Sequence, residues 1–290
     1  MNALAKSQIL KYISNQPIIN RTILSNSFDI ICEKITLSNH VCIVAKYYEK
    51  KNLIFNAIKS EGSSLIFMNK KFPNLFPTTK LLTDDVLIMN FIENNGIRSD
   101  HYQNVLAKEI ARIHSVTNDQ YGFKFDSQIG GLKQPNDYSS NWINFFRDQR
   151  LNIVFELINQ NKPMPSSINQ KLEVVIKNLQ NFIPSNPKIS LLHGDLWSGN
   201  ILFHNKKLVG LIDPGIFFGH NELEIAYLKW FNYINTSFLD YYSEIIKLEK
   251  DYYTYEPIYQ IYYSLLNVLL WNRKYISDVD RLLNNILNKK

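Results

Sequence analysis

The stretch between residues 191 and 215 constrains the fold of this chain more than any other part of the sequence. An apolar pair leads into a polar loop, which reads His193-Gly194-Asp195-Leu196-Trp197-Ser198-Gly199-Asn200. Two apolar runs follow, Ile201–Phe203 and Leu208–Ile212, with the turn residues His204–Lys207 between them. Two strands joined by a tight turn have their outer ends side by side, so we expect Asn200 and Asp213 at one edge of a hairpin.

Two carboxylates and one amide at a loop edge are the groups that phosphoryl transfer needs. Asp195 would accept the proton of an attacking hydroxyl, while Asn200 and Asp213 would hold Mg²⁺ against the phosphates of ATP. The spacing Asp-x-x-x-x-Asn, followed by an Asp after a short hairpin, is the arrangement of a kinase catalytic loop. Asp195 alone could be an ordinary turn residue, but the complete pattern favours catalysis.

A kinase also needs a lysine on a strand and an acid on a helix to bind the nucleotide phosphates. Lys46 ends the run Ile43-Val44-Ala45-Lys46 within the alternating stretch Val41–Tyr48, and Glu61 follows in a helical stretch over Asn52–Met68. Without the loop of residues 193–200, these two residues would read as an ordinary surface pair. With it, we predict that Lys46 and Glu61 bind ATP.

The loop that covers the phosphates is expected near residues 27–38, between the first two strands, and it lacks glycine because the first glycine of the chain is Gly62. Cys32 lies beside this loop and is expected to be a half-buried strand residue. The strand over Val86–Phe91 would lead into a hinge whose backbone contacts adenine. These candidate adenine contacts are Met89, Asn90, Phe91 and Ile92.

Composition bounds the class of protein. With 45% hydrophobic and 20% charged residues, the 290-residue chain can bury a core without disulfides, and its two cysteines are too few for a disulfide scaffold. The net charge of +6 comes from scattered lysines and arginines, so it does not indicate a nucleic-acid partner. There is no apolar run long enough for a membrane span and no signal segment at the start, so we expect a cytoplasmic protein.

The chain changes character near Glu93-Asn94-Asn95-Gly96. Before it, a helical pattern around Ile9 is followed by strand-like runs near Asp29–Thr36, Val41–Tyr48, Thr79–Leu82 and Val86–Phe91. After it, apolar residues recur at helical spacing, as in Tyr102–Ile113 and Leu172–Phe182. We therefore predict an α+β, protein-kinase-like bilobal fold, with a small β-rich N-lobe over residues 1–92 and a larger, mainly helical C-lobe over 93–290.

The loop of residues 193–200 resembles the His-Gly-Asp-Leu-Trp-Ser-Gly-Asn loop of the fructosamine kinase (ketoamine 3-kinase) family, within the aminoglycoside-phosphotransferase and choline-kinase-like group. Further stretches are similar to family motifs, and together they cover most of residues 40–285. They are Tyr121-Gly122-Phe123, Gln134-Pro135-Asn136, Trp142, Phe145-Phe146, Gln149-Arg150-Leu151, Asp213-Pro214, Gly219-His220 and Tyr262 with Leu265-Leu266-Asn267.

Two departures from the family pattern stand out. The family has Gly-Gly before the second strand, which this chain lacks, and its Glu-x-Asp after the metal-binding Asp is here Glu222-Leu223-Glu224.

The resemblance implies ATP-dependent phosphorylation of the C3 hydroxyl of a ketoamine, such as fructosamine or ribulosamine on a small molecule or a glycated protein, which leads to deglycation. Within this scheme Trp197 and Glu222 are candidate substrate contacts. His193 and Arg150 are expected to be structural, the latter through an internal salt bridge.

Two rival functions stay open at this point. The chain could be another kinase of this fold that acts on an aminoglycoside, choline or a thiamine-like amino alcohol. The missing glycines also allow a catalytically silent nucleotide-binding scaffold, although all four candidate residues, Lys46, Asp195, Asn200 and Asp213, are present. A nucleic-acid-binding module is the weakest alternative.

Overall fold

The computed structural model describes residues 3–14, 16–50 and 54–288. Asn52 and Leu53, the first residues of the predicted helical stretch, lie outside them. The chain divides into two compact units, each built from several segments. The first unit contains residues 1–102, 127–133 and 199–215, and the second contains residues 103–126, 134–198 and 216–290.

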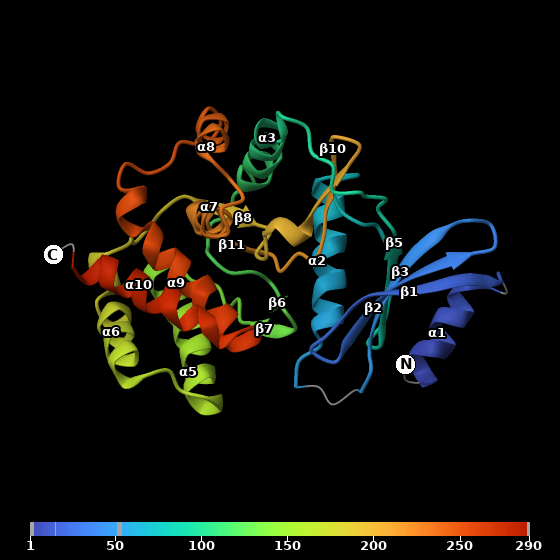
Figure 1. The fold of residues 1–290 in the computed structure, drawn as a ribbon, viewed down its shortest axis with the longest axis horizontal. Helices are drawn as coiled ribbons and strands as arrows, with labels where there is room; N and C mark the ends of the chain where they lie inside the picture. Colours follow the sequence, from blue (N-terminus) through green and yellow to red (C-terminus); the bar gives the residue numbers. More distant parts are fainter. Residues whose placement is uncertain (1–2, 15, 51–53, 289–290) are drawn as a thin grey trace. The chain divides into compact units, whose positions relative to one another are not determined.

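The first unit is built on a five-stranded antiparallel sheet with the order β1-β2-β3-β5-β4 (Figure 1). Its strands are β1 (Ile18–Ser27), β2 (Ile30–Leu37), β3 (Cys42–Tyr48), β4 (Thr79–Leu82) and β5 (Val86–Asn90). Two helices belong to it, α1 (Ala3–Ile13) and α2 (Ala57–Lys71). The strand-like runs and the two helical stretches predicted before Glu93 are therefore confirmed.

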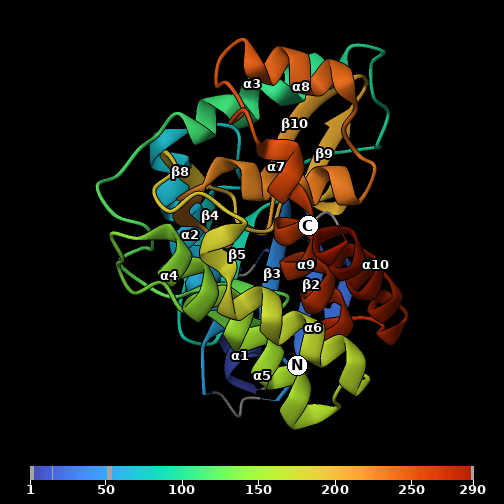
Figure 2. The same ribbon diagram turned by 90° about the vertical axis from the view of Figure 1, so that its left-hand side faces the viewer.

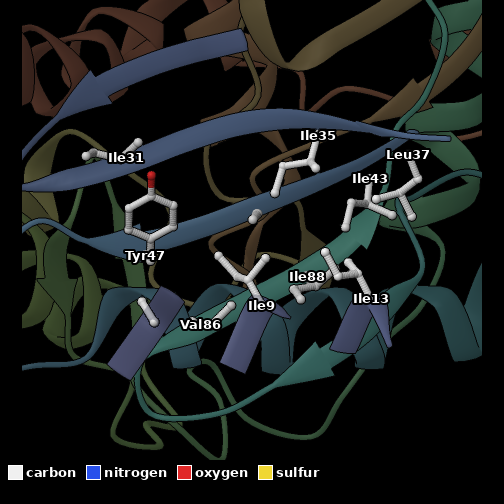
Figure 3. Close-up of a cluster of buried hydrophobic side chains, with 11 residues drawn as sticks. Ile9, Ile13, Ile31, Ile35, Leu37, Ile43, Tyr47, Val86 and Ile88 are labelled. Atoms are coloured by element: carbon white, nitrogen blue, oxygen red, sulfur yellow. The ribbon is translucent and has the colours of Figure 1, made fainter. Parts of the chain in front are cut away.

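Helix α1 covers one face of this sheet. Its residues Ala5, Ile9 and Ile13 recur every four positions, so they share one face of the helix, and all three are buried. Figure 3 shows Ile9 and Ile13 pointing toward Val86 and Ile88 of strand β5, inside a cluster that includes side chains from β2 and β3. This cluster fixes the sheet that carries Lys46.

Strand β1 was not predicted. Nearly all residues of this edge strand are exposed, so neither of its faces is covered. It also carries polar residues such as Asn20, Arg21 and Asn26 among exposed apolar ones such as Ile23, so no apolar face repeats with a period of two. Alternation predicts strands that have one buried face, and β1 lacks that signal.

Two hairpins complete the first unit. One joins β6 (Ser127–Ile129) to β7 (Leu132–Gln134), whose last residue belongs to the second unit. The other joins β9 (Ile201–His204) to β10 (Lys207–Leu211) through Asn205 and Lys206, both with positive φ, as a two-residue hairpin turn requires. The hairpin predicted after Asn200 is confirmed.

The second unit is mainly helical. Its helices are α3 (Tyr102–His114, of which Tyr102 belongs to the first unit), α4 (Trp142–Phe146), α5 (Asn152–Asn161), α6 (Ser166–Lys177), α7 (Asn221–Trp230), α8 (Thr236–Ser243), α9 (Tyr252–Leu270) and α10 (Ile276–Leu287). A short antiparallel pair joins β8 (Ile189–Leu192) to β11 (Phe217–His220). Helices α9 and α10 lie side by side (Figures 1 and 2). The helix predicted over Leu172–Phe182 ends earlier, at Lys177, and a short 3₁₀ turn follows.

The core of the second unit is rich in aromatic rings. Trp142 is fully buried, and its indole Nε1–H donates a 2.8 Å hydrogen bond to the hydroxyl of Tyr259. The rings of Phe145 and Phe146 stack on it with centroids 5.7 and 5.4 Å away. A buried indole with a satisfied N–H is a stable centre for the packing of α4 against α9.

No helix among residues 3–14, 16–50 and 54–288 is both long and apolar enough to cross a membrane.

Candidate active site

The structure brings Lys46, Glu61 and Asp213 together in the first unit. The Nζ atom of Lys46, on β3, lies 2.7 Å from Oε1 of Glu61 on α2 and 2.7 Å from Oδ1 of Asp213. Lys46 and Glu61 are 6% and 5% exposed, whereas the side chain of Asp213 is 36% exposed. One ammonium group therefore bridges a buried acid and an acid that reaches solvent.

Burial and mutual attraction set the charges of this cluster. Burial alone would lower the pKa of Lys46, but the carboxylates of Asp213 and Glu61 outweigh it and raise the pKa above its ordinary value. Burial raises the pKa of Glu61, an effect that Lys46 opposes and Asp213 reinforces. Lys46 is therefore a permanent cation at neutral pH, as a phosphate-binding lysine must be.

Asn200 and Asp213 lie at the open end of the β9–β10 hairpin. The backbone N–H of Ile212 donates a 3.0 Å hydrogen bond to the carbonyl of Asn200, which extends the pairing by one step toward Asp213. Asn200 is 5% exposed. Asp213 has a φ of +57°, a left-handed conformation that Asp tolerates better than most residues and that marks a locally constrained position.

The donor set at this hairpin end fits Mg²⁺. The ion prefers hard oxygen ligands and is usually held by one or two protein groups, with water and substrate phosphates completing its shell. Asp213 and Asn200 provide a carboxylate and an amide oxygen. The described part of the chain contains no cluster of three or more His, Cys, Asp or Glu side chains that would favour a site made of protein ligands alone.

The loop between the first two strands is shorter than predicted. It is the two-residue turn Phe28-Asp29, with φ values of +55° and +59°, between the paired residues Ser27 and Ile30. Glycine and asparagine are the usual residues in such turns, so a phenylalanine there is exceptional. Cys32 lies further along β2, where burial raises the pKa of its thiol to about 12, so it is neutral at physiological pH.

The four predicted adenine contacts follow or end strand β5. Met89 pairs with Val44 and is buried, and Asn90 pairs with Ile43. The N–H of Phe91 donates to the carbonyl of Cys42 at 3.3 Å. The carbonyl of Ile92 accepts a 2.9 Å hydrogen bond from the side chain of Asn94. This segment continues strand β5 past Leu87, the residue that pairs with Lys46, and its contact with adenine stays a prediction.

The loop that carries Asp195 is held by a buried carboxylate in the second unit. Glu224, on α7, accepts hydrogen bonds from the backbone N–H groups of His193 at 3.1 Å and Gly194 at 2.6 Å. Gly194 has a φ of +88°, which turns the chain directly before the half-buried Asp195. Both backbone donors ahead of the candidate base are therefore fixed by one side chain.

A hydrogen-bond chain continues from Glu224 into two further helices. Its Oε2 lies 2.9 Å from Nε2 of His114 on α3, and Nδ1 of His114 lies 2.8 Å from the hydroxyl of Tyr242 on α8. Asn221 donates to the same hydroxyl at 2.8 Å. Burial would raise the pKa of Glu224, but His114 and the backbone of Gly194 hold it below its ordinary value.

Sequence reasoning missed His114 and treated Glu224 only as a departure from a family pattern. No clear signal was present in the sequence, because acidic residues such as Glu224 are common in the first turn of a helix. Its partner His114 is 110 residues earlier in the chain. Only the fold brings the two side chains together.

The two predicted substrate contacts differ in their surroundings. Trp197 is partly exposed, and its ring centroid lies 5.9 Å from that of Phe231. Glu222 is 1% exposed, and it accepts hydrogen bonds from the hydroxyl of Tyr255 and, at 2.5 Å, from the backbone N–H of Glu249. Burial raises the pKa of Glu222 to about 7, although these hydrogen bonds oppose the rise.

His193 and Arg150 are buried. Nδ1 of His193 accepts a 3.3 Å hydrogen bond from the backbone N–H of Asp195. Arg150 lies in a π-helical turn and donates to the carbonyl of Pro135 at 2.7 Å and to Oδ1 of Asn136 at 2.6 Å. Its guanidinium carbon also lies 4.0 Å from the ring centroid of Phe217. Arg150 is therefore held by oxygen acceptors and aromatic rings, whereas the sequence predicted an internal salt bridge.

A strand lysine bonded to a helix glutamate, an Asp after a hairpin and a His-Gly-Asp loop together define a phosphotransferase of the protein-kinase-like superfamily. The solved structures agree with this fold. A crystal structure of a candidate fructosamine-3-kinase from Thermobifida fusca YX-ER1 matches with a TM-score of 0.86 at 20% identity, over 99% of both chains. An ADP-bound aminoglycoside phosphotransferase matches with a TM-score of 0.65 at 17% identity, over 98% of both chains. The predicted protein-kinase-like fold is confirmed.

Sequence comparisons identify the family. A family model described as fructosamine kinase matches residues 47–289. A probable ketoamine kinase of Enterococcus faecium is 34% identical over 204 residues, covering 69% of this chain and 71% of that protein. A chloroplastic protein-ribulosamine 3-kinase of Arabidopsis thaliana is 31% identical over 205 residues, covering 69% and 61%. This chain belongs to the fructosamine kinase family, and it is a phosphotransferase with a hydroxyl acceptor that uses ATP.

Proposed function

We propose that this protein transfers the γ-phosphoryl group of ATP to the C3 hydroxyl of a ketoamine, a sugar carried on an amine. The observation that carries the proposal is the bonding of Lys46 to both Glu61 and Asp213, in a chain of the fructosamine kinase family. The ketoamine is a ribulosamine or a fructosamine, on a small amine or on a glycated protein. The ketoamine 3-phosphate is unstable, and its breakdown releases the amine.

Each candidate residue has a distinct task in this reaction. Asp195 accepts the proton of the attacking hydroxyl, because it is the only carboxylate in the loop of residues 193–200. Glu224 positions that loop through the N–H groups of His193 and Gly194. Trp197, which is partly exposed, offers an apolar face to the sugar or its amine. Glu222, which is buried among its own partners, would act on the substrate only indirectly.

The nucleotide is held by the first unit. Lys46 attracts the phosphates, and Glu61 holds the ammonium group in place. The segment Met89–Ile92 contacts the adenine through backbone groups. Asn200 and Asp213 would hold Mg²⁺, which neutralises the charge that develops on the phosphates when it is bound. One carboxylate oxygen of Asp213 accepts a hydrogen bond from Lys46, so Asp213 would connect the lysine ammonium group with the Mg²⁺ ion.

Mass spectrometry of a substrate panel tests this function. The purified protein is incubated with Mg-ATP and with fructosamine and ribulosamine derivatives of a small amine and of a glycated protein. We expect the mass of one added phosphate on a ketoamine, together with release of ADP. An aminoglycoside, choline and thiamine serve as controls.

The controls separate the rival functions. Phosphorylation of a control compound without any ketoamine turnover would show that the protein is a kinase of the same fold with a different substrate. A protein that binds Mg-ATP, but phosphorylates nothing in the panel, would be the silent scaffold. Either outcome contradicts the proposal.

A further inference from the structure

The turn at Phe28-Asp29 occupies the place where the family pattern has glycines. Both residues have left-handed backbone conformations, which cost on the order of 1 kcal/mol or more for a residue with a Cβ atom. Asp29 is also tied to the end of β3, because its carbonyl accepts a 2.8 Å hydrogen bond from the N–H of Glu49. A turn with this cost persists only when the surrounding structure fixes it.

The turn at Phe28-Asp29 lies a short distance along the sheet from Lys46. Cys32 pairs with Lys46 in the sheet, and Asp29 lies three residues before Cys32 on the same hairpin. At about 3.3 Å for each strand residue, the turn reaches roughly 10 Å beyond the lysine. This distance is suitable for a loop whose backbone amides cover phosphates that Lys46 also contacts.

A second hairpin of the first unit contacts the turn. The loop between β6 and β7 contains Gly130 and Gly131, with φ values of +53° and +79° (Figure 1 labels both strands). A Cβ atom at Gly131 would lie 3.1 Å from Cβ of Phe28 and 3.6 Å from Cγ of its ring. The backbone of Gly131 is itself held, because its N–H donates a 3.0 Å hydrogen bond to the side chain of the buried Gln128.

We propose that Gly131 and Phe28 form a contact that positions the glycine-free phosphate loop for ATP. The close approach of the ring to Gly131 keeps the turn in one place, so that its backbone amides are ready for the phosphates before ATP binds. Gly131 is required because a larger residue would displace Phe28 by a few tenths of an ångström. Gly131 and Phe28 are positioning residues, and this inference rests on the proposed nucleotide site.

Steady-state kinetics of Gly131→Ala test the contact. We expect the KM for ATP to rise about 5-fold, the equivalent of roughly 1 kcal/mol, with little change in the KM for the ketoamine. Gly96→Ala is the matched control, because Gly96 has a similar φ of +71° but no atom within 4 Å of an added Cβ. Both variants carry the same backbone cost, and only Gly131→Ala touches Phe28. An equal rise of the KM for ATP in Gly96→Ala would overturn the proposal.

The double variant Phe28→Gly/Gly131→Ala distinguishes loss of the contact between Phe28 and Gly131 from a general destabilisation of the protein. Phe28→Gly alone should also raise the KM for ATP, since the ring contact is lost although the turn conformation is easier for glycine. In that background, adding Gly131→Ala should change the KM for ATP by less than about 2-fold, because no Cβ remains at position 28 to be displaced. Equal effects of Gly131→Ala in both backgrounds would contradict a direct contact.

Direct ATP binding keeps the two proposals distinguishable. The dissociation constant for Mg-ATP is measured by calorimetry for the wild-type protein and all four variants. If the wild-type protein phosphorylates no ketoamine, the proposed function fails, while the binding constants still test the loop. If the wild-type protein is active, and Phe28→Gly binds Mg-ATP as tightly as the wild-type protein, then the proposed role of Phe28 and Gly131 is wrong while the proposed function stands.

Discussion

Asp195 is the residue whose replacement separates chemistry from binding. Asp195→Asn keeps the size of the side chain and removes the proposed base, so turnover should fall at least about 10²-fold, the lower end of what a general base contributes. The affinity for ATP should change much less, since the lysine cluster is untouched. Turnover is measured by ADP release, and near-normal turnover in Asp195→Asn would show that another group accepts the proton.

Lys46 differs from other paired lysines of the first unit by its burial. Lys46→Met leaves Glu61 buried without its cation, which should cost about 3–5 kcal/mol of the free energy of unfolding. The matched control is Lys59→Met, whose ion pair with Asp84 has the same length of 2.7 Å but is about 60% exposed on both sides. Its loss should cost about 0–1 kcal/mol.

Chemical denaturation at pH 8 measures both lysine variants. The cost of Lys46→Met should be smaller at pH 5, because a buried carboxyl that has lost its cation becomes neutral more easily. If Lys46→Met and Lys59→Met cost the same at pH 8, the buried pair does not hold the site together.

At the scale of elements, one side chain of α7, Glu224, fixes the loop that carries the proposed base, Asp195. Glu224→Gln keeps the length of the side chain, but it replaces one acceptor oxygen by a donor, so one of the N–H groups of His193 and Gly194 loses its partner. We expect kcat to fall about 10- to 10²-fold, because small displacements of a catalytic group are costly. The KM for ATP should stay within about 2-fold of the wild-type value.

Two further variants distinguish positioning from stability. Glu224→Asp keeps the charge and should recover part of kcat, even though it is shorter by one methylene. Glu256→Gln removes another buried acid, which pairs with Lys229 at 2.7 Å, and should leave kcat unchanged. A loss of kcat in Glu256→Gln as large as in Glu224→Gln would indicate a general effect of destabilisation.

The elements differ in how well the sequence predicts them. The β9–β10 hairpin could be predicted because its turn residues and both apolar runs indicate the same structure, and the observed strand pairing confirms it. Strand β1 was missed because both of its faces are exposed, so its sequence needs no alternation of apolar and polar residues. Glu61 could be predicted from its place on a helix after Lys46, whereas the contact of Phe28 with Gly131 joins segments about a hundred residues apart and has no local signal.

At the scale of the whole molecule, buried acids make the stability depend on pH. The pKa of Glu222 is raised to about 7 in the folded protein, from an ordinary value near 4.5. The folded state therefore binds the proton more tightly than the unfolded state does. The resulting stabilisation is complete below about pH 4.5 and is lost as the pH rises to about 7.

Glu222→Gln removes this titration. The free energy of unfolding of the wild-type protein, relative to that of Glu222→Gln, should decrease by up to about 3 kcal/mol between pH 4.5 and 7 and stay constant above. Denaturation curves at several pH values measure the difference. A difference that is independent of pH in this range would mean that Glu222 keeps its ordinary pKa.

The aromatic core of the second unit has a spectroscopic consequence. The chain contains four tryptophans, and all of them lie in the second unit, at positions 142, 197, 230 and 271. Trp142 is shielded from water, while Trp271 is 58% exposed, so their emission maxima differ. Indole fluorescence therefore monitors unfolding of the helical unit alone, and the strands that carry Lys46 need an added chromophore to be followed.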